Sequence, residues 1–438
     1  MPLSSHDHRV IFDFSLDRLD VALQAPDGRW LIPHQAFDNN WTGFCELKQL
    51  LLTQLAQAIE PAHLTAVGES TGPYWWHAFF HLAHEPDLAA FEPDLALLNP
   101  KHVKHFRKAL PEQDKTDAHD PMLIGRYYQS YGVKDFYTFD LRYLPLRQLS
   151  RAYCRLTHSL ASEKAFCGTV VYLLASEYVR EKPFSKLFGA TSTFILAEYP
   201  DIEALAAIPV DDLAELLNTR ARGLLKDPTA NARKLHQVAE RSYPLPAELA
   251  ATVHAVLTLT LDHIRFLERQ RGTYRALLAD QLAALPEAQR ALAHAGLGTV
   301  LVAGCLGEIQ DTRRFTTGQK YDHKRKRWRT RTYRDGQAGV AKLAGLWWPR
   351  NASGRFEGQD RHLARERNPY LRYWLTQAAY SLKRHRDDYA EYYNRKYNEV
   401  NKHQHQRALI LTARKATRLI FALLHKAQMA RLKEDATD

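Results

Sequence analysis

The chain has 438 residues, 45% of them hydrophobic, and a formal net charge of +11. This composition is ordinary for a folded protein with a sizeable core and excludes a disordered chain. Residues 1–310 hold 30 basic and 36 acidic side chains, whereas residues 311–438 hold 30 basic and 13 acidic ones. So uneven a distribution argues against a uniformly basic coat protein. It indicates an acidic front part and a basic rear part that would hold a polyanion such as nucleic acid.

Neither a membrane segment nor cysteine chemistry is indicated. No apolar run approaches the roughly 20 residues that a membrane helix needs, and the start from Met1 to Arg9 is polar and rich in histidine. The four cysteines lie far apart without a C-x-x-C pair, which argues against a disulfide framework and a structural zinc site. We therefore expect a cytoplasmic protein.

The first third of the chain alternates short strands and helices. Strands are predicted at 9–15, 19–24 and 29–37, with a Pro-Asp-Gly turn before the third, so these three form a meander. A helix at 41–59, a buried strand at 64–69, a helix at 75–84 and a strand at 94–100 follow. This order predicts an α/β fold with a mixed sheet.

Two long helical segments are predicted further on, at about 146–179 and 246–285. They suit a dimerising coiled coil, but packing inside one subunit explains them equally well, because strict heptads are not sustained.

Four carboxylates lie in the predicted elements of this part of the chain. Asp13 lies in the first strand, Glu69 ends the fourth, and Asp117 and Asp120 share one face of a following helix because they are three residues apart. Four converging carboxylates would repel one another unless Mg²⁺ or Mn²⁺ lay between them. Two such ions about 4 Å apart serve in-line attack at a phosphodiester. Each acid also has a plainer interpretation: Asp117 as a helix N-cap, and the neighbouring Asp17 and Asp20 as surface charges.

Three features suit nucleic-acid backbones. Gly296-Leu297-Gly298, between two apolar helical segments, resembles a helix-hairpin-helix, although a plain helix connection is the alternative. Cations interleave with aromatic residues from Lys320 to Arg334, where a solvated basic loop is the alternative. The candidate binding side chains of this basic segment are Lys324, Arg325, Lys326, Arg327, Trp328, Arg329 and Arg331. The third feature is the group Lys101, Lys104, Arg107 and Lys108, and Arg355 is a further candidate.

The front of the chain resembles a known family. Asp13 with Leu19-Asp20-Val21, Glu69-Ser-Thr-Gly72, Asn99-Pro-Lys101 and the segment 114–120 (DKTDAHD) are similar to the DEDD, RuvC-like domain of insertion-sequence transposases of the IS one-ten family, Piv-type DNA invertases included. The likeness covers about residues 8–130. It implies that Asp13, Glu69, Asp117 and Asp120 are the catalytic metal-binding acids, holding two Mg²⁺.

The rear of the chain resembles the second domain of that family. Gly296-Leu297-Gly298 is followed by Leu343-Ala-Gly-Leu346 with Pro349, and then by 351–355 (NASGR). The resemblance implies that Ser353 is the catalytic nucleophile, although composition alone would make it an ordinary loop serine. The basic segment between Thr316 and Val340 is longer than in the family.

The resemblance also implies an architecture and partners. We expect an α/β plus α protein: a RuvC-like (RNase-H-like) mixed sheet with helices at 1–140, a helical coiled-coil region for dimerisation at 141–288, and a mainly helical transposase domain with the serine at 289–438. The partners would be donor and target DNA, a structured guide (bridge) RNA, and further copies of the chain in a dimer or tetramer with composite active sites. The protein would work at a bacterial nucleoid.

Two other functions remain open. A metal-dependent, structure-specific endonuclease of the Holliday-junction type would use the four acids alone. A nucleic-acid-binding scaffold with a decayed site would use none of them. The sequence has no G-x-x-x-x-G-K-[ST] loop, so no ATP-dependent step is expected.

Overall fold

The computed structural model describes residues 7–57, 62–110, 119–133, 136–199, 202, 204–322, 325–349, 352–353, 356–357 and 362–435, with the backbone alone at 119, 352–353 and 356–357. The chain divides into two compact units, Met1–Leu141 and Arg142–Asp438. Within the described ranges, every helix is too short or too polar to cross a membrane.

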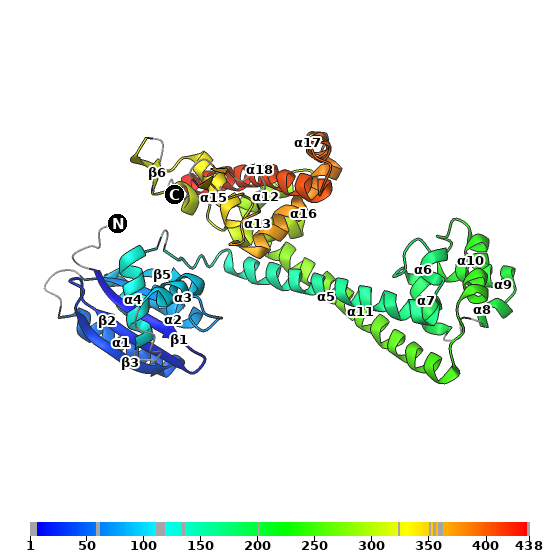
Figure 1. The fold of residues 1–438 in the computed structure, drawn as a ribbon, viewed down its shortest axis with the longest axis horizontal. Coiled ribbons are helices and arrows are strands. Elements are labelled where there is room, and N and C mark those ends of the chain that lie inside the picture. The colour runs from blue at the N-terminus through cyan, green and yellow to red at the C-terminus, as the bar shows by residue number, and fades with distance from the viewer. Residues whose placement is uncertain are drawn as a thin grey trace. The chain divides into compact units, whose positions relative to one another are not determined.

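A five-stranded mixed sheet forms the centre of the first unit, drawn in blue to cyan in Figure 1. Its strands are β1 (Asp7–Phe14), β2 (Arg18–Gln24), β3 (Trp30–Asp38), β4 (His63–Glu69) and β5 (Asp94–Leu98). Their order is β3-β2-β1-β4-β5. The first three strands pair antiparallel, while β4 pairs parallel with β1 and β5 parallel with β4. The predicted meander and mixed sheet are thus confirmed, and Gly28 in the turn has a φ of 92°, which suits glycine.

Helices cover both faces of this sheet. They are α1 (Trp41–Leu55), α2 (Trp76–His84), the 3₁₀ helix η1 (Pro86–Phe91), α3 (Pro100–Ala109) and α4 (His119–Tyr131). Alternate residues of a strand point to opposite faces. Phe12 therefore packs in the core with α1 and α2, while Ile11 packs with α3 and α4. The helix predicted from Trp41 to Ile59 ends at Leu55, and Ile59 lies outside the described residues.

The second unit is mainly helical. Its elements are α5 (Leu144–Leu174), α6 (Tyr178–Glu181), α7 (Ala190–Glu198), α8 (Ala204–Ala207), α9 (Val210–Arg220), α10 (Pro228–Arg241), α11 (Ala247–Ala283), α12 (Pro286–Leu292), α13 (Thr299–Ile309), α14 (Arg313–Thr316), β6 (Gln319–Asp322), β7 (Arg327–Thr330), α15 (Tyr333–Leu343), β8 (Ala352–Ser353), β9 (Phe356–Glu357), α16 (Pro369–His385), α17 (Asp387–Asn398) and α18 (Gln404–Glu434).

The helices α5 and α11 run side by side and take part in two separate cores (Figure 1). The end of α5 and the start of α11 pack with α7, α9 and α10 in one core. The start of α5 and the end of α11 pack with α12, α13, α15, α16 and α18 in the other. An ion pair between Lys164 and Glu268, 2.5 Å apart, links the two helices beside the first of these cores. The division of this half at residue 288 stays a prediction.

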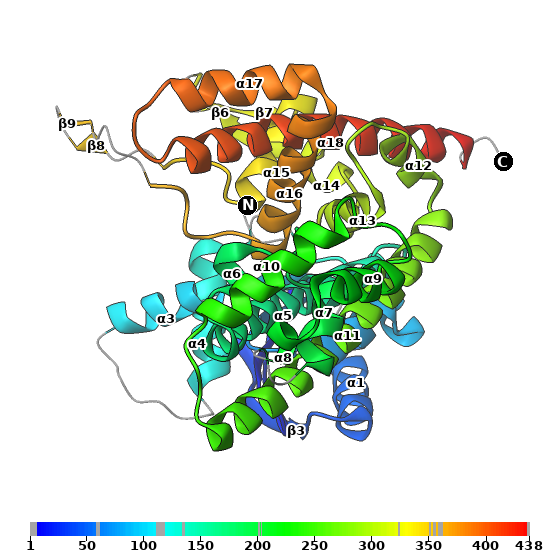
Figure 2. The ribbon, with the colours of Figure 1, turned by 90° about the vertical axis from the view of Figure 1, so that its right-hand side faces the viewer.

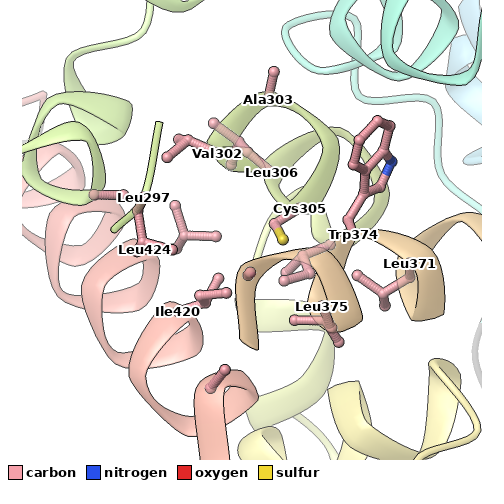
Figure 3. Close-up of a cluster of buried hydrophobic side chains, with 14 of the residues drawn as sticks. Leu297, Val302, Ala303, Cys305, Leu306, Leu371, Trp374, Leu375, Ile420 and Leu424 are labelled. Carbon is pink, nitrogen blue, oxygen red and sulfur yellow. The ribbon is translucent and has the colours of Figure 1, made fainter. Parts of the chain in front are cut away.

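The larger core is closed around Trp374 of α16, whose exposed fraction is 1% (Figure 3). Figure 2 shows α16, α17 and α18 together in the upper part of the view. A Cβ on Gly304 of α13 would lie 2.3 Å from the indole of Trp374, so only glycine lets α13 approach α16 this closely.

Substituting Trp374→Ala should lower the free energy of unfolding by about 3–5 kcal/mol, because it leaves a large cavity in this core. Urea unfolding measures the change. The matched control is Trp328→Ala, whose side chain is 65% exposed and whose loss should stay within about 0.5 kcal/mol. Equal losses for the two variants would contradict this description of the core.

Candidate functional site

Three of the four predicted acids meet at one edge of the sheet. The parallel pairing of β1 with β4 places Phe12 opposite Gly68, so Asp13 and Glu69 come next to each other where both strands end. Asp120 lies in the first turn of α4, which packs against β1, and is 6% exposed. Asp117 lies outside the described residues.

The three carboxylates interact electrostatically. Burial raises the pKa of Asp13, and the negative charge of Asp120 raises it further. Burial also raises the pKa of Glu69, with the charge of Asp13 as the next cause, to about 7. This is the response expected of acids that share one small volume, and it marks the edge as a candidate functional site.

Arg107 supplies the positive charge at this edge. Its guanidinium Nη2 lies 2.7 Å from Oδ1 of Asp120, and its charge lowers the pKa of both Asp13 and Glu69. Arg107 lies in α3, which begins at the Asn99-Pro100 motif. Oδ1 of Asn99 accepts from the backbone N–H of Lys101 at 3.0 Å, which is a helix N-cap, and Pro100 suits the first helical position.

The Glu69-to-Gly72 motif forms a tight turn beside the acids. The backbone N–H of Thr71 donates to the carbonyl oxygen of Glu69 at 2.8 Å, and a side-chain hydrogen bond from Thr71 lowers the pKa of Glu69. Both the N–H and the hydroxyl of Ser70 donate to the carbonyl oxygen of Leu98, at 3.0 and 3.2 Å. Gly72 has a φ of 54°. The motif therefore fixes where the carboxylate of Glu69 leaves the sheet.

Asp20 belongs to the same edge. It is directly opposite Asp13 in the β1–β2 register, is 8% exposed, and accepts a hydrogen bond from Nε2 of His34 at 2.8 Å. The surface-charge interpretation is therefore wrong for Asp20, although Asp17 is exposed. The sequence analysis missed His34. The only sequence signal for the burial of Asp20 was its position between Leu19 and Val21 in a predicted strand. That pattern does not reveal which strand supplies the partner of Asp20.

No ready-made metal site is present among the described residues, where no three carboxylate, imidazole or thiol side chains are arranged to hold an ion. The donor chemistry is nevertheless that of a hard cation, because Asp13, Glu69 and Asp120 offer carboxylate oxygens only. The four cysteines are free, and three of them are buried.

The cations predicted to bind nucleic acid on α3 divide into two kinds. Lys101, Lys104 and Lys108 are exposed, whereas Arg107 is half-buried against Asp120. Three exposed lysines on one short helix are suited to contacts with phosphates.

The Gly-Leu-Gly motif lies between α12 and α13, as predicted. Gly296 has a φ of 87°, and a Cβ there would lie 3.2 Å from the side chain of Leu382, so its role in packing is sufficient to explain it. Gly298 is the N-cap of α13 and has open space around its Cα. Nucleic-acid contact at these glycines stays a prediction.

The basic aromatic segment is a hairpin of β6 and β7. Trp328 is 65% exposed and packs edge-to-face on Tyr321, its cross-strand partner, with ring centroids 5.5 Å apart. Arg329 donates two hydrogen bonds to Asp335, which also pairs with Lys320 at 2.9 Å, and these contacts hold the pKa of Asp335 well below its usual range. Arg325, Lys326 and Arg327 are exposed at the turn, Arg331 donates to the carbonyl oxygen of Arg314, and Lys324 lies outside the described residues.

Ser353 lies in β8, where it pairs with Phe356 of β9. Its side chain and the whole of Arg355 lie outside the described residues.

The chain that leads into and out of this hairpin is held by Arg372 of α16, a residue that the sequence analysis missed. Its guanidinium donates to the carbonyl oxygens of Ala344, Gly345 and Ala364, at 3.0, 2.6 and 3.0 Å. A Cβ on Gly345, whose φ is 66°, would lie 2.5 Å from that guanidinium, which explains the glycine. No sequence pattern signals these contacts, because Arg372 reaches them from a separate helix.

Comparison with protein families gives a match. Residues 12–169 match the model of the DEDD transposase domain of the IS110 family, described as a transposase. A search among curated proteins finds no match. The first unit, with its acidic sheet edge, therefore resembles a domain of IS110-family transposases, and the match supports an insertion-sequence transposase that acts on DNA. It ends at residue 169, inside α5, well before Ser353.

Glu69→Gln should change how stability depends on pH. The folded protein binds a proton at Glu69 with a pKa of about 7 against an ordinary 4.5, so this group lowers the free energy of unfolding as the pH rises from 4.5 to 7. The variant should be more stable than the wild type at pH 8 by about 1–2 kcal/mol, after allowance for the solvent-exposed part of the side chain, with little difference at pH 4.5.

Urea unfolding in EDTA at both pH values measures this effect. Glu46→Gln is the matched control, since Glu46 is exposed on α1 and should give the same small change at both. A pH-independent effect of Glu69→Gln would contradict the raised pKa.

Proposed function

We propose that this protein is the transposase of an insertion sequence, which cuts and rejoins DNA through a covalent phosphoserine link at Ser353. The observation that carries the proposal is the meeting of Asp13, Glu69 and Asp120 at one sheet edge, inside the segment that matches a transposase domain. A sheet in which the ends of β1 and β4 are neighbours is also what an RNase-H-like or RuvC-like domain requires.

The acids are suited to divalent cations. Asp13, Glu69 and Asp120, together with Asp117, would hold two Mg²⁺ or Mn²⁺. When bound, these ions supply positive charge to the attacking and leaving oxygens of a phosphodiester. Arg107 already offsets part of the negative charge, and its remaining guanidinium N–H groups can donate to a phosphate oxygen at the same edge.

Ser353 would supply the nucleophile. Its oxygen would form a bond to the scissile phosphorus while the bond from phosphorus to the oxygen of one DNA strand breaks. The serine proton passes to a base, and the leaving strand oxygen takes up a proton and becomes a free hydroxyl. The phosphoserine ester then keeps the energy of the broken bond. Attack by a free strand hydroxyl reverses the step and joins the DNA, so no ATP is required. Arg372 supports this chemistry by fixing both chain segments that flank the hairpin.

A structured bridge RNA and further copies of the chain belong to the same proposal. The exposed Trp328 and the cations at the β6–β7 turn suit contacts with RNA through stacking and phosphates. Large apolar side chains are exposed on α5 and α11, among them Phe166, Leu173, Leu259 and Phe266, and such surfaces commonly pair with a partner chain. We infer from them a dimer or tetramer with composite active sites.

A structure-specific, metal-dependent endonuclease is the second candidate. It is favoured by one observation: the matched domain ends before Ser353, so the acids alone carry the established likeness. This enzyme would hydrolyse DNA without forming a link to the protein.

Ser353→Ala should abolish both strand joining and the covalent protein–DNA species, because no other atom can replace the hydroxyl. Denaturing gels with labelled DNA detect that species. Ser159→Ala, an exposed serine on α5, is the matched control and should behave as the wild type. Asp13→Asn should abolish cleavage altogether. If Ser353→Ala still cuts and joins DNA, the phosphoserine proposal is wrong, and cutting without joining would favour the endonuclease.

The protein should co-purify with one discrete RNA species whose loops are complementary to the ends of its element and to its insertion site. Sequencing of the bound RNA after nuclease trimming checks this expectation. A mixture that mirrors bulk cellular RNA would count against guidance while leaving the transposase proposal intact.

A further inference from the structure

A groove lies between α15 and α18 in the second unit, with a volume of about 390 Å³. Its lining consists of Arg334, Gln337, Ala338, Ala341, Arg414 and Arg418. The groove is therefore within the range of about 300 to 1,000 Å³ that is usual for ligand sites, and larger than a single inorganic ion needs.

Helical geometry builds this groove from residues far apart in sequence. Arg334, Gln337, Ala338 and Ala341 are spaced by three, one and three residues and so share one face of α15. Arg414 and Arg418 are one turn apart on α18. Because Ala338 and Ala341 are small, the space between the helices stays open, and the arginines line it from both sides.

The groove carries positive charge that is not paired with a carboxylate among the described residues. Its described lining contains no carboxylate, and none of its three arginines forms an ion pair within the part of the chain that the structure describes. Neighbouring cations differ: Lys320 and Arg329 pair with Asp335, and Lys415 of α18 pairs with Asp388. Three guanidinium groups around one cavity repel each other unless an anion lies among them.

Two contacts give the groove a fixed form. Nε2 of Gln337 donates to the backbone carbonyl oxygen of Arg418 at 3.3 Å, which ties α15 to α18. The guanidinium of Arg414 lies over the ring of Trp348, 5.8 Å from its centroid, and this cation–π contact orients the arginine. The site is thus assembled before any ligand arrives.

We propose that this groove binds the phosphodiester backbone of a nucleic-acid strand. Guanidinium groups pair with phosphate oxygens through two parallel hydrogen bonds, and three of them facing one cavity can hold adjacent phosphates of a strand. This site is separate from the β6–β7 hairpin and from the acidic sheet edge. It rests on the proposed function, since a transposase must hold DNA and, if guided, RNA.

The test compares Arg414→Ala/Arg418→Ala with the wild type in the full-length protein. Anisotropy of a labelled DNA strand, its duplex and an RNA of the same sequence, measured from about 50 to 200 mM salt, gives the dissociation constant and its salt slope. Losing two phosphate contacts should weaken binding and reduce the slope of log K against log salt by about 1 to 2. Weakening of one probe alone assigns the groove to that polymer, which supports the proposal.

The matched control is Arg275→Ala/Arg290→Ala, which removes the same charge from two exposed residues of α11 and α12. A groove variant with the same affinity and slope as this control overturns the proposal. Arg414→Lys/Arg418→Lys keeps the charge and loses the paired geometry, so affinity should fall while the slope stays near that of the wild type. Arg334→Ala, on the opposite helix, should reduce the slope by about 1 and serves if the double variant unfolds.

The failure of this inference differs from the failure of the proposed function. If the protein cuts and joins DNA normally while the groove variant binds like the control, the transposase proposal stands and the groove proposal is wrong. If the wild-type protein binds none of the three probes, both proposals are wrong.

Discussion

The parallel pairing of β1 with β4 is the constraint on which the acidic site depends. It aligns two strands that are about fifty residues apart in sequence, so that the carboxylates near their ends meet at the same edge. The repulsion between Asp13 and Glu69 is unfavourable for folding, and the hydrophobic packing of Phe12 and Ile11 on opposite faces of the sheet offsets it. Arg107 then limits the remaining imbalance of charge. The edge is thus strained electrostatically and held by its packing, which is typical of functional sites.

Part of the positive charge of the rear part is already paired within the protein. Arg329 is bound to Asp335, and Arg372 to three backbone carbonyl oxygens. These arginines stabilise the fold and are not available to a polyanion. The formal charge therefore overstates the positive charge that is available to bind a nucleic acid. Binding depends most on cations that have no partner within the described part of the protein.

Local patterns made much of the fold predictable. The meander could be predicted because a Pro-Asp-Gly turn lies between strand-like segments. The helices α5 and α11 could be predicted because these long stretches have apolar residues at helical spacing and few helix breakers. The four acids were predicted as site residues from their positions in the predicted strands and helix and from the resemblance to a known family.

Contacts between distant segments could not be predicted in the same way. The buried Asp20 accepts a hydrogen bond from His34 of the neighbouring strand β3, and the groove joins α15 to a helix some eighty residues later. The need for glycine at position 304 is likewise visible only once Trp374 is packed against it. Each of these depends on which elements become neighbours, and local periodicity carries no information about that.

The helices α5 and α11 have a consequence for how this protein can vary. Each contributes side chains to both cores of the second unit, so its length fixes the spacing of the cores and its helical phase fixes their relative rotation. One inserted residue turns everything beyond it by roughly 100° and shifts it by about 1.5 Å. The paired helices therefore tolerate changes of length only in steps that nearly complete whole turns, such as matched changes of about seven residues in both.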